Sequence, residues 1–415
     1  MSEVTNIPQL RFPEFSDEWE EKKLGDVTSW SSGGTPSKAV PHYWNGKIPW
    51  ISASSMKGKY FIDSKLKITL EGLKAGSKLA PKNSILLLVR GSMLFKKIPF
   101  GLAETDVAFN QDVKCLKVLG ESTFDFIYYW FCHSENHLLN MVTGTGIGAG
   151  KLETSYVQLM NVNIPEFLEQ EKIAAFLTTV DNKIEQLSKK QELLKEYKKG
   201  LMQQIFSQVI RFKADDGSDF PDWEEKKLGG IGHTFNGLTG KTKDDFGRGK
   251  PYIQYMQIFE SSKINIDNFG LVDVRDDENQ KVAQYGDVFF TTSSETPDAV
   301  GYSSVLLDDI DKLYLNSFCF GFRPNSIDEL SPNFAQFLLR SAHFRRRVVR
   351  LAQGSTRYNM SKVQLMKEVI SLPCLKEQTK IANFLSSIDS KIEQVSKQLD
   401  ESKQFKKALL QQMFV

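Results

Sequence analysis

Two stretches of this chain, residues 169–206 and 377–414, carry the same long heptad pattern. Apolar residues recur at alternating steps of four and three, which predicts a continuous helix with a narrow apolar stripe. A helix of this length spans roughly 57 Å, and a stripe that long has to be covered. The obvious cover for one stretch is the other. The alternative is two amphipathic helices, each lying on its own globular core.

The predicted seam is the set of residues at which the two helices would touch. In the first stretch it consists of Ile173, Leu177, Val180, Ile184, Leu187 and Leu194, and in the second of Ile381, Leu385, Ile388, Ile392, Val395 and Leu399.

The repetition extends beyond the heptads, so the whole chain reads as two tandem copies. The run Trp-Glu-Glu-Lys-Lys-Leu-Gly occurs at Trp19 and again at Trp223, and Val-Gln-Leu-Met occurs at Val157 and Val363. A pseudo-two-fold axis between the copies would make the long helices an antiparallel coiled coil. We predict a globular part at 1–165 with a repeat segment at 11–27, a long helix at 166–207, a second globular part at 208–373 and a second long helix at 374–415.

Each globular part is predicted to be a mixed α/β domain, which makes the chain α+β overall. Short β-type runs broken by turn residues occur at 85–89, 113–118, 288–290 and 317–322. One helix is expected near the end of each part, over Phe124–Met141 and Pro332–Leu351.

Composition narrows the class of protein. With 415 residues, the chain is too long for one ordinary core. It shows no signal peptide and no apolar run long enough for a membrane span. The four cysteines lie far apart, as in a reduced cytoplasmic protein. The net charge is only +2, so any binding to nucleic acid must come from local patches.

Motifs that resemble catalytic or metal sites fail on spacing. Gly144–Lys151 resembles a phosphate-binding loop, but the spacing before its final Gly-Lys is one residue too long, and Leu152 stands where a magnesium-binding hydroxyl is needed. A predicted helix also precedes it where a strand is required. His133 and His137 could share a helical face, but Glu135 is at the wrong offset for the zinc protease motif. The Pro-Pro loop that amino-methylating enzymes use to hold an amine does not occur. We therefore predict no catalytic residue and no metal site in this chain.

Basic residues are concentrated in two places, one in each copy. Residues 38–97 hold twelve Lys or Arg against two acidic residues, and residues 331–367 hold eight Lys or Arg and no acidic residue. A charge run is usually just a solvated surface, but two single-sign patches favour a polyanion as the partner. Lys and Arg bind phosphates, and forked Arg and amide groups read base edges.

Candidate DNA-binding residues lie in these patches and in the polar loops after the predicted strands. In the first copy they are Thr35, Ser37, Lys38, Tyr43, Lys47, Arg90, Ser92, Lys96, Lys97, Asn110 and Gln111. In the second copy they are Thr239, Lys241, Lys243, Arg248, Thr292, Ser293, Ser294, Arg345, Arg346, Arg347, Arg357, Tyr358 and Asn359.

With these features in place, the sequence resembles the specificity subunits of type I restriction-modification systems. The resemblance rests on the repeats at Trp19 and Trp223, and on the Pro-x-x-x-Glu-Gln-x-Lys-Ile-Ala-x-Phe-Leu entries at Pro165 and Pro373. The twin helix ends and the run from Gly34 to Trp50 belong to it too. The second copy departs from the pattern at Leu238, where Gly-Thr-Pro would be expected.

The resemblance implies a DNA-binding subunit that is not itself an enzyme. Each globular part would be a target recognition domain that reads one half of a bipartite double-stranded DNA sequence, and the long helices would set the gap between the halves. Two copies of a modification subunit would methylate adenine with S-adenosylmethionine. Separate restriction subunits would use ATP and Mg²⁺ for translocation and cleavage, so no cofactor is expected in this chain.

Two other classes of function remain open at this point. A coiled-coil adaptor that binds only proteins would leave the basic patches as ordinary surface. A self-contained modifying enzyme is disfavoured by the missing amine-binding loop. Salt-dependent binding to a gapped DNA consensus would separate the first reading from the adaptor.

Overall fold

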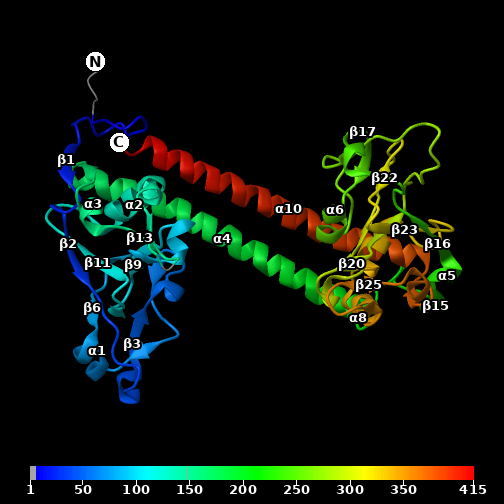
Figure 1. Cartoon of the computed structure of the whole chain (residues 1–415), viewed down its shortest axis with the longest axis horizontal. Helices are drawn as coiled ribbons and strands as arrows, with labels where there is room; N and C mark the ends of the chain where they lie inside the picture. Colours follow the sequence, from blue (N-terminus) through cyan, green and yellow to red (C-terminus); the bar gives the residue numbers. More distant parts are fainter. Residues whose placement is uncertain (1–5, 147) are drawn as a thin grey trace. The chain divides into compact units, whose positions relative to one another are not determined.

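The computed structural model describes residues 6–146 and 148–415, so residues 1–5 of the first predicted domain and Ile147 of the glycine-rich run lie outside the described residues. The chain divides into two compact units (Figure 1). Unit 1 is formed by residues 1–188 with 398–415, and unit 2 by residues 189–397. Each unit therefore takes residues from both long helices.

The core of unit 1 is a five-stranded sheet covered by an aromatic helix. Its strand order is β2 (Thr28–Ser32), β11 (Val113–Val118), β7 (Ile85–Leu88), β9 (Phe100–Ala103) and β4 (Tyr60–Phe61), antiparallel except for the β9–β4 pair. All four residues of β7 are buried, as expected of a strand without polar residues. Helix α2 (Phe124–Asn140) is capped by the Thr123 hydroxyl and buries six consecutive residues from Phe126 to Phe131 in this core.

Two smaller sheets extend unit 1. A four-stranded sheet has the order β5 (Lys67–Ile68), β3 (Trp44–Ile51), β10 (Val107–Phe109) and β6 (Lys78–Ala80), with helix α1 (Leu70–Gly76) beside it. A three-stranded sheet has the order β12 (Thr143–Gly144), β13 (Gly150–Lys151) and β8 (Arg90–Gly91). The repeat segment forms β1 (Glu20–Lys23), which pairs with β14 (Asn161–Ile164) after the short helix α3 (Thr154–Gln158).

Unit 2 repeats this plan with different loops. The main sheet has the order β16 (Gly232–Asn236), β23 (Cys319–Pro324), β19 (Val288–Thr291) and β21 (Ser303–Val305), with α6 (Tyr255–Glu260) and α7 (Pro332–Leu338) against it. A second sheet is β18 (Gly270–Val272), β17 (Phe246–Ile253) and β22 (Tyr314–Leu315). The small three-stranded sheet is β20 (Ser293–Ser294), β25 (Tyr358–Met360) and β24 (Ala352–Gln353).

The second repeat segment forms β15 (Glu224–Lys227), which pairs with β26 (Val369–Leu372) and leads into α5 (Leu228–Ile231). Helix α9 (Lys362–Leu365) precedes β26.

The long helices are α4 (Phe167–Phe206) and α10 (Leu375–Gln412). In unit 1 the beginning of α4 shares its core with the end of α10 (Figure 1), and in unit 2 the end of α4 shares its core with the beginning of α10. Asp181 pairs with Lys406 in unit 1, and Asp389 pairs with Lys198 in unit 2, each at 2.5 Å. Asp389 and Lys406 lie 208 positions after Asp181 and Lys198, so the two ion pairs are repeats of each other. Within each unit the two helices run antiparallel.

Exposure along the helices follows the spacing of the predicted seam. Eight of the twelve seam residues are buried, namely Ile173, Leu177, Leu187, Ile381, Leu385, Ile388, Val395 and Leu399. Leu409, beyond the predicted set, is buried as well. Val180, Ile184, Leu194 and Ile392 are half-buried.

The Glu-Gln pair at the start of each long helix is fully buried and fastens the helix to its unit. Arg11 donates two hydrogen bonds to the Glu169 carboxylate, at 2.8 and 2.7 Å, and Arg211 does the same to Glu377. The Gln170 side chain accepts from the Thr123 backbone N–H at 2.8 Å and donates to the Pro165 carbonyl. Gln378 makes the equivalent bonds in unit 2. These contacts explain why the same residues occur in both copies.

The prediction of a single helix over Pro332–Leu351 is wrong. The segment forms two helices, α7 and α8 (Ala342–Arg350), because Ser341 adopts an extended conformation and its hydroxyl accepts from the Phe344 N–H. The side chain of Arg340, at the break, donates to the carbonyls of Ser303, Ile258, Phe259 and Ser261.

The alignment of Val157-Gln-Leu-Met with Val363-Gln-Leu-Met is out of register by two residues. Leu24 N–H donates to Met160 in unit 1, and Leu228 N–H donates to Glu368 in unit 2, so Met160 corresponds to Glu368. Burial follows this register, since Val157 and its counterpart Leu365 are fully buried while Val363 is 66% exposed. The identical letters mark different structural positions.

Candidate nucleic-acid interface

The small sheet of unit 1 brings candidate residues together with residues that the sequence analysis passed over. Arg90 on β8 lies directly opposite Lys151 on β13, and Lys151 lies opposite Thr143 on β12. Arg90 and Thr143 are exposed, and Lys151 is half-buried and paired with Glu153. Only Arg90 of these three was predicted. Lys151 was missed because it belongs to the glycine-rich run Gly144–Lys151, which was weighed only as a phosphate loop, and Thr143 lies directly before that run.

The corresponding sheet of unit 2 unites two candidate groups that lie far apart in the sequence. Ser293 lies opposite Asn359, Ser294 opposite Tyr358, and the Met360 N–H donates to the Thr292 carbonyl at 2.9 Å. Asn359 in turn lies opposite Gln353 on β24. The turn from β24 to β25 needs Gly354, because its φ is +136° and a Cβ there would meet the Arg357 carbonyl oxygen at 2.1 Å.

Most candidate residues lie at the surface, and a minority are engaged inside the protein. The exposed ones are Ser37, Lys38, Lys47, Arg90, Ser92, Lys96, Lys97, Gln111, Thr239, Lys243, Arg248, Arg346, Arg357 and Asn359. The half-buried ones are Thr35, Tyr43, Lys241, Thr292, Ser293, Ser294, Arg345, Arg347 and Tyr358, and Asn110 is buried.

The first polar loop of unit 1 is tied to the end of the main sheet. The Thr35 hydroxyl donates to the Gln111 side chain at 2.7 Å, which places these two candidates side by side. The indole of Trp50 donates to the Gly34 carbonyl and that of Trp44 to the Ser37 carbonyl. The tryptophans of the aromatic run therefore hold the loop in place.

The matching loop of unit 2 is held in place by an ion pair between Lys241 and Glu278. The ammonium of Lys241 is 2.6 Å from the Glu278 carboxylate, and only 7% of the Lys241 side chain is exposed. The hydrogen bond from Lys241, with further ones from Gln280 and the Arg275 backbone, lowers the pKa of Glu278 to about 2. Lys241 is therefore paired inside the loop, while Lys243 and Arg248 stay exposed.

Three other candidates are occupied by internal bonds. Arg345 donates to the carbonyls of Gly301, Asp298 and Val300, and burial lowers the pKa of its guanidinium. Arg347 donates to the Val369 carbonyl. Asn110 is 7% exposed, and its side chain donates to Asp112 at 3.1 Å. Arg345 thus supports a turn, Arg347 connects α8 to β26, and Asn110 bonds to a neighbouring side chain.

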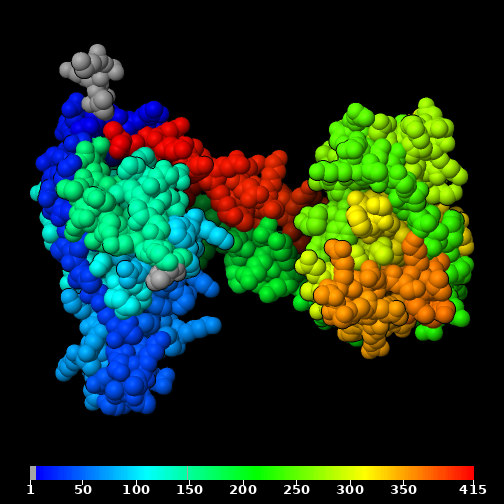
Figure 2. Space-filling view, viewed as in Figure 1, coloured from blue at the N-terminus to red at the C-terminus, as the bar shows by residue number. Residues whose placement is uncertain are grey.

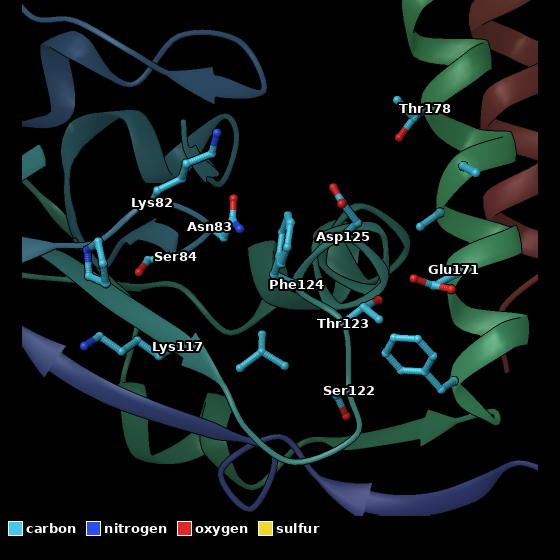
Figure 3. Close-up of a pocket in the computed structure, with 15 residues that line it drawn as sticks. Lys82, Asn83, Ser84, Lys117, Ser122, Thr123, Phe124, Asp125, Glu171 and Thr178 are labelled. Atoms are coloured by element: carbon cyan, nitrogen blue, oxygen red, sulfur yellow. The ribbon is translucent and has the colours of Figure 1, made fainter. Parts of the chain in front are cut away.

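A cleft of about 920 Å³ in unit 1 lies where the globular part meets the long helix (Figure 3). Thr123, Phe124 and Asp125 at the start of α2 face Glu171 and Thr178 of α4 across it (Figure 3). Burial raises the pKa of Asp125, and Lys59 stands 3.9 Å away. Lys59 also donates to Tyr129 and Thr178. The charged groups around the cleft thus join α2 to α4.

The motifs that resembled catalytic and metal sites have other places in the fold. Gly144 pairs with Gly150 across strands β12 and β13, so the Gly150-Lys151 pair lies in a strand and does not begin a helix. The His133 Nδ1 lies 2.7 Å from the Leu410 carbonyl oxygen, and its ring stacks on Phe414. Within residues 6–146 and 148–415, no three His, Cys, Asp or Glu side chains are grouped as metal ligands. None of the helices in that part of the chain is long and apolar enough to cross a membrane.

Both copies of the repeat match a known protein family. The sequence model of the type I restriction modification DNA specificity domain matches residues 16–196 and again 221–402. The specificity subunit of the type I restriction enzyme EcoR124I/EcoR124II from Escherichia coli is 34% identical over 175 residues, which cover 41% of this chain and 43% of that protein. The MjaVIII specificity subunit from Methanocaldococcus jannaschii is 28% identical over 428 residues, covering 97% of this chain and 92% of that one.

Solved structures with this fold come from the same kind of protein. The S subunit of a type I restriction-modification system from M. genitalium aligns with a TM-score of 0.58 at 17% identity, over 99% of both chains. A chain from a study of complex assembly and conformational transition of the type I R-M system aligns with a TM-score of 0.55 at 18% identity, over 94% of this chain and 96% of that one. The adaptor reading finds no support among these relatives. The chain belongs to the family of type I restriction-modification DNA specificity proteins, the recognition subunits of these systems and not their catalytic ones.

Proposed function

We propose that this chain reads a bipartite double-stranded DNA target, one half with the globular part of each copy. The observation that carries the proposal is the repeated small sheet. It has the same strand pairing in both units, but its exposed side chains differ in chemistry. A scaffold that is repeated within the chain but carries different polar groups suits two readers of different sequences, because the groups that reach base edges decide which base is preferred.

The two long helices would form one antiparallel coiled coil that fixes the gap between the two half-sites. The repeated ion pairs of Asp181 with Lys406 and Asp389 with Lys198 support this, as does the burial of apolar residues at heptad spacing. Phosphate contacts would position the protein along the duplex, and base contacts would be confined to the two ends.

The partners follow from the same symmetry. Two similar copies offer two similar surfaces, so we propose that two copies of a modification subunit bind, with restriction subunits joining them. S-adenosylmethionine, ATP and Mg²⁺ would be used by those subunits. The assembly would work in the cytoplasm, where its DNA is.

The direct test maps methylated adenines in DNA from cells that contain this chain and its modification subunit. We expect one gapped motif with two constant half-sites and a constant number of unspecified bases between them. Affinity of the purified assembly for that motif should fall steeply with salt, because bound phosphates release counterions. Methylation without a gapped motif, or equal affinity for every duplex, would end the proposal.

A further inference from the structure

The small three-stranded sheet carries one row of side chains that lie directly opposite one another across its strands. In unit 1 the row is Arg90, Lys151 and Thr143, and in unit 2 it is Ser293, Asn359 and Gln353. Directly opposed residues of neighbouring strands point to the same face of a sheet. We name these two sets of three the outer rows.

The two outer rows occupy equivalent positions. β8 and β20 each begin two residues after the buried central strand, β7 or β19. The residue after the middle member of each row is buried, and its N–H bonds to the residue just before β8 or β20. Leu152 N–H donates to the Val89 carbonyl, and Met360 N–H donates to the Thr292 carbonyl. Arg90 therefore corresponds to Ser293, and Lys151 to Asn359.

Internal packing does not account for the residues in these rows. Arg90, Thr143, Gln353 and Asn359 are exposed, and Lys151 and Ser293 are half-buried. Leu152 and Met360, each next to the middle member of a row, are buried. Gly150, next to Lys151, is buried, and a Cβ there would meet Leu94 and Val142 at 2.9 Å. The side chains of Thr143 and Asn359 make only long hydrogen bonds, each 3.4 Å, to the carbonyls of Lys151 and Arg357. Lys151 pairs with Glu153, which is itself at the surface. The segment around residue 350, coloured orange, forms part of the open surface of unit 2 (Figure 2).

The chemistry of the two rows differs in the way that base recognition requires. Arg binds the O6 and N7 atoms of guanine with its fork, while Asn and Gln bind the N6 and N7 atoms of adenine. A narrow β-ribbon fits the major groove of B-DNA. Unit 1 offers a guanidinium, an ammonium and a hydroxyl, and unit 2 offers two carboxamides and a hydroxyl.

We propose that the outer rows read base edges, with Arg90 specifying guanine in the half-site of unit 1, and Asn359 with Gln353 specifying adenine in that of unit 2. This assignment rests on the proposed function. It adds Thr143, Lys151 and Gln353 to the specificity residues and gives each row one position in its own half-site. Lys151 exchanges its partner Glu153 for DNA on binding.

The test compares motifs methylated by assemblies that carry single substitutions. With Arg90→Gln, the half-site of unit 1 should lose its preference for guanine at one position by about 10- to 100-fold, which corresponds to one bidentate contact. The half-site of unit 2 should stay as it was. With Asn359→Ser, the change should fall in the half-site of unit 2 alone, at an adenine. Lys82→Gln is the matched control, because Lys82 is an exposed lysine of unit 1 with one carboxylate partner, Glu104, and it should leave both half-sites unchanged.

Arg90→Lys separates base reading from phosphate binding, because it keeps the charge and loses the fork. Base reading predicts that Arg90→Lys also relaxes the guanine preference. The proposal is overturned if Arg90→Lys keeps the wild-type motif while Arg90→Gln weakens all sequences equally and lowers the salt dependence by about one phosphate contact. It is also overturned if both half-sites stay unchanged in all row variants while the wild type shows a gapped motif. If the wild type shows no gapped motif, the proposed function itself fails.

Discussion

Arg345 and Arg346 are neighbours in the same helix, yet the fold gives them different tasks. The guanidinium of Arg345 donates to three backbone carbonyls and lies 4.3 Å from the centre of the Tyr302 ring. The carbonyl oxygens belong to residues around η5 (Pro297–Ala299), so Arg345 holds this turn on α8. Arg346 points away from the core and is exposed. The run of three arginines in the sequence does not distinguish the two, because both tasks need a cation.

Replacing these arginines one at a time separates stability from DNA binding. Arg345→Ala should lower the free energy of unfolding by about 2 kcal/mol, because it leaves several carbonyls without their charged donor. Arg346→Ala should change it by less than about 0.5 kcal/mol. In thermal unfolding Arg345→Ala should therefore melt earlier while Arg346→Ala melts with the wild type. Equal melting temperatures for both variants would show that the three carbonyl bonds contribute nothing.

Among the elements, the long helices were the most predictable from sequence, because their pattern repeats over many turns and is local. The small sheets were not predictable. Their strands are two or three residues long, and their partners are distant, as with Arg90 opposite Lys151 and Ser293 opposite Asn359. No periodicity can be detected in so short a strand. The helix over Pro332–Leu351 was misjudged for a related reason, since a single capping serine, Ser341, outweighs an otherwise continuous pattern.

The two repeated ion pairs of the helices allow a prediction at the scale of the element. Asp181 accepts from Tyr129 at 2.8 Å in addition to its pair with Lys406, and its side chain is 19% exposed. Asp389 pairs with Lys198 next to Phe337, and is 39% exposed. Because less solvent reaches the first pair, Asp181→Asn should destabilise its unit more than Asp389→Asn, which should cost about 0.5 kcal/mol.

Urea unfolding of the two variants measures this difference. The exchange variant Lys198→Asp with Asp389→Lys is the control, because it restores opposite charges across the helices and should recover the loss. If a double-mutant cycle gives no coupling energy between residues 198 and 389, this ion pair does not stabilise the protein.

At the scale of the whole molecule, unit 1 is built from two separate stretches of chain, and each unit contains parts of both long helices. Phe414 near the end of the chain stacks on Phe126 and packs edge-on against Trp19 in the core of unit 1. Phe206 at the end of α4 takes the equivalent place in unit 2, beside Trp223 and Phe334. Each recognition part therefore depends on the end of a helix that begins in the other unit. Residues added to both helices at the boundary between the units would therefore leave each of these cores intact.

Insertion of four helical residues between Ser188 and Lys189, and four more between Lys397 and Gln398, makes that change. Both sites lie where the chain passes from one unit to the other, so each unit keeps its own ion pair and core. Four residues add about 6 Å of helix rise, while one base step of B-DNA measures about 3.4 Å. If the helices set the gap, the unspecified stretch of the target should grow by one or two base pairs, with both half-sites unchanged. Methylation mapping reads the gap and the half-sites in the same experiment, and an inserted chain that still methylates the original gap would show that something other than the helices measures the distance.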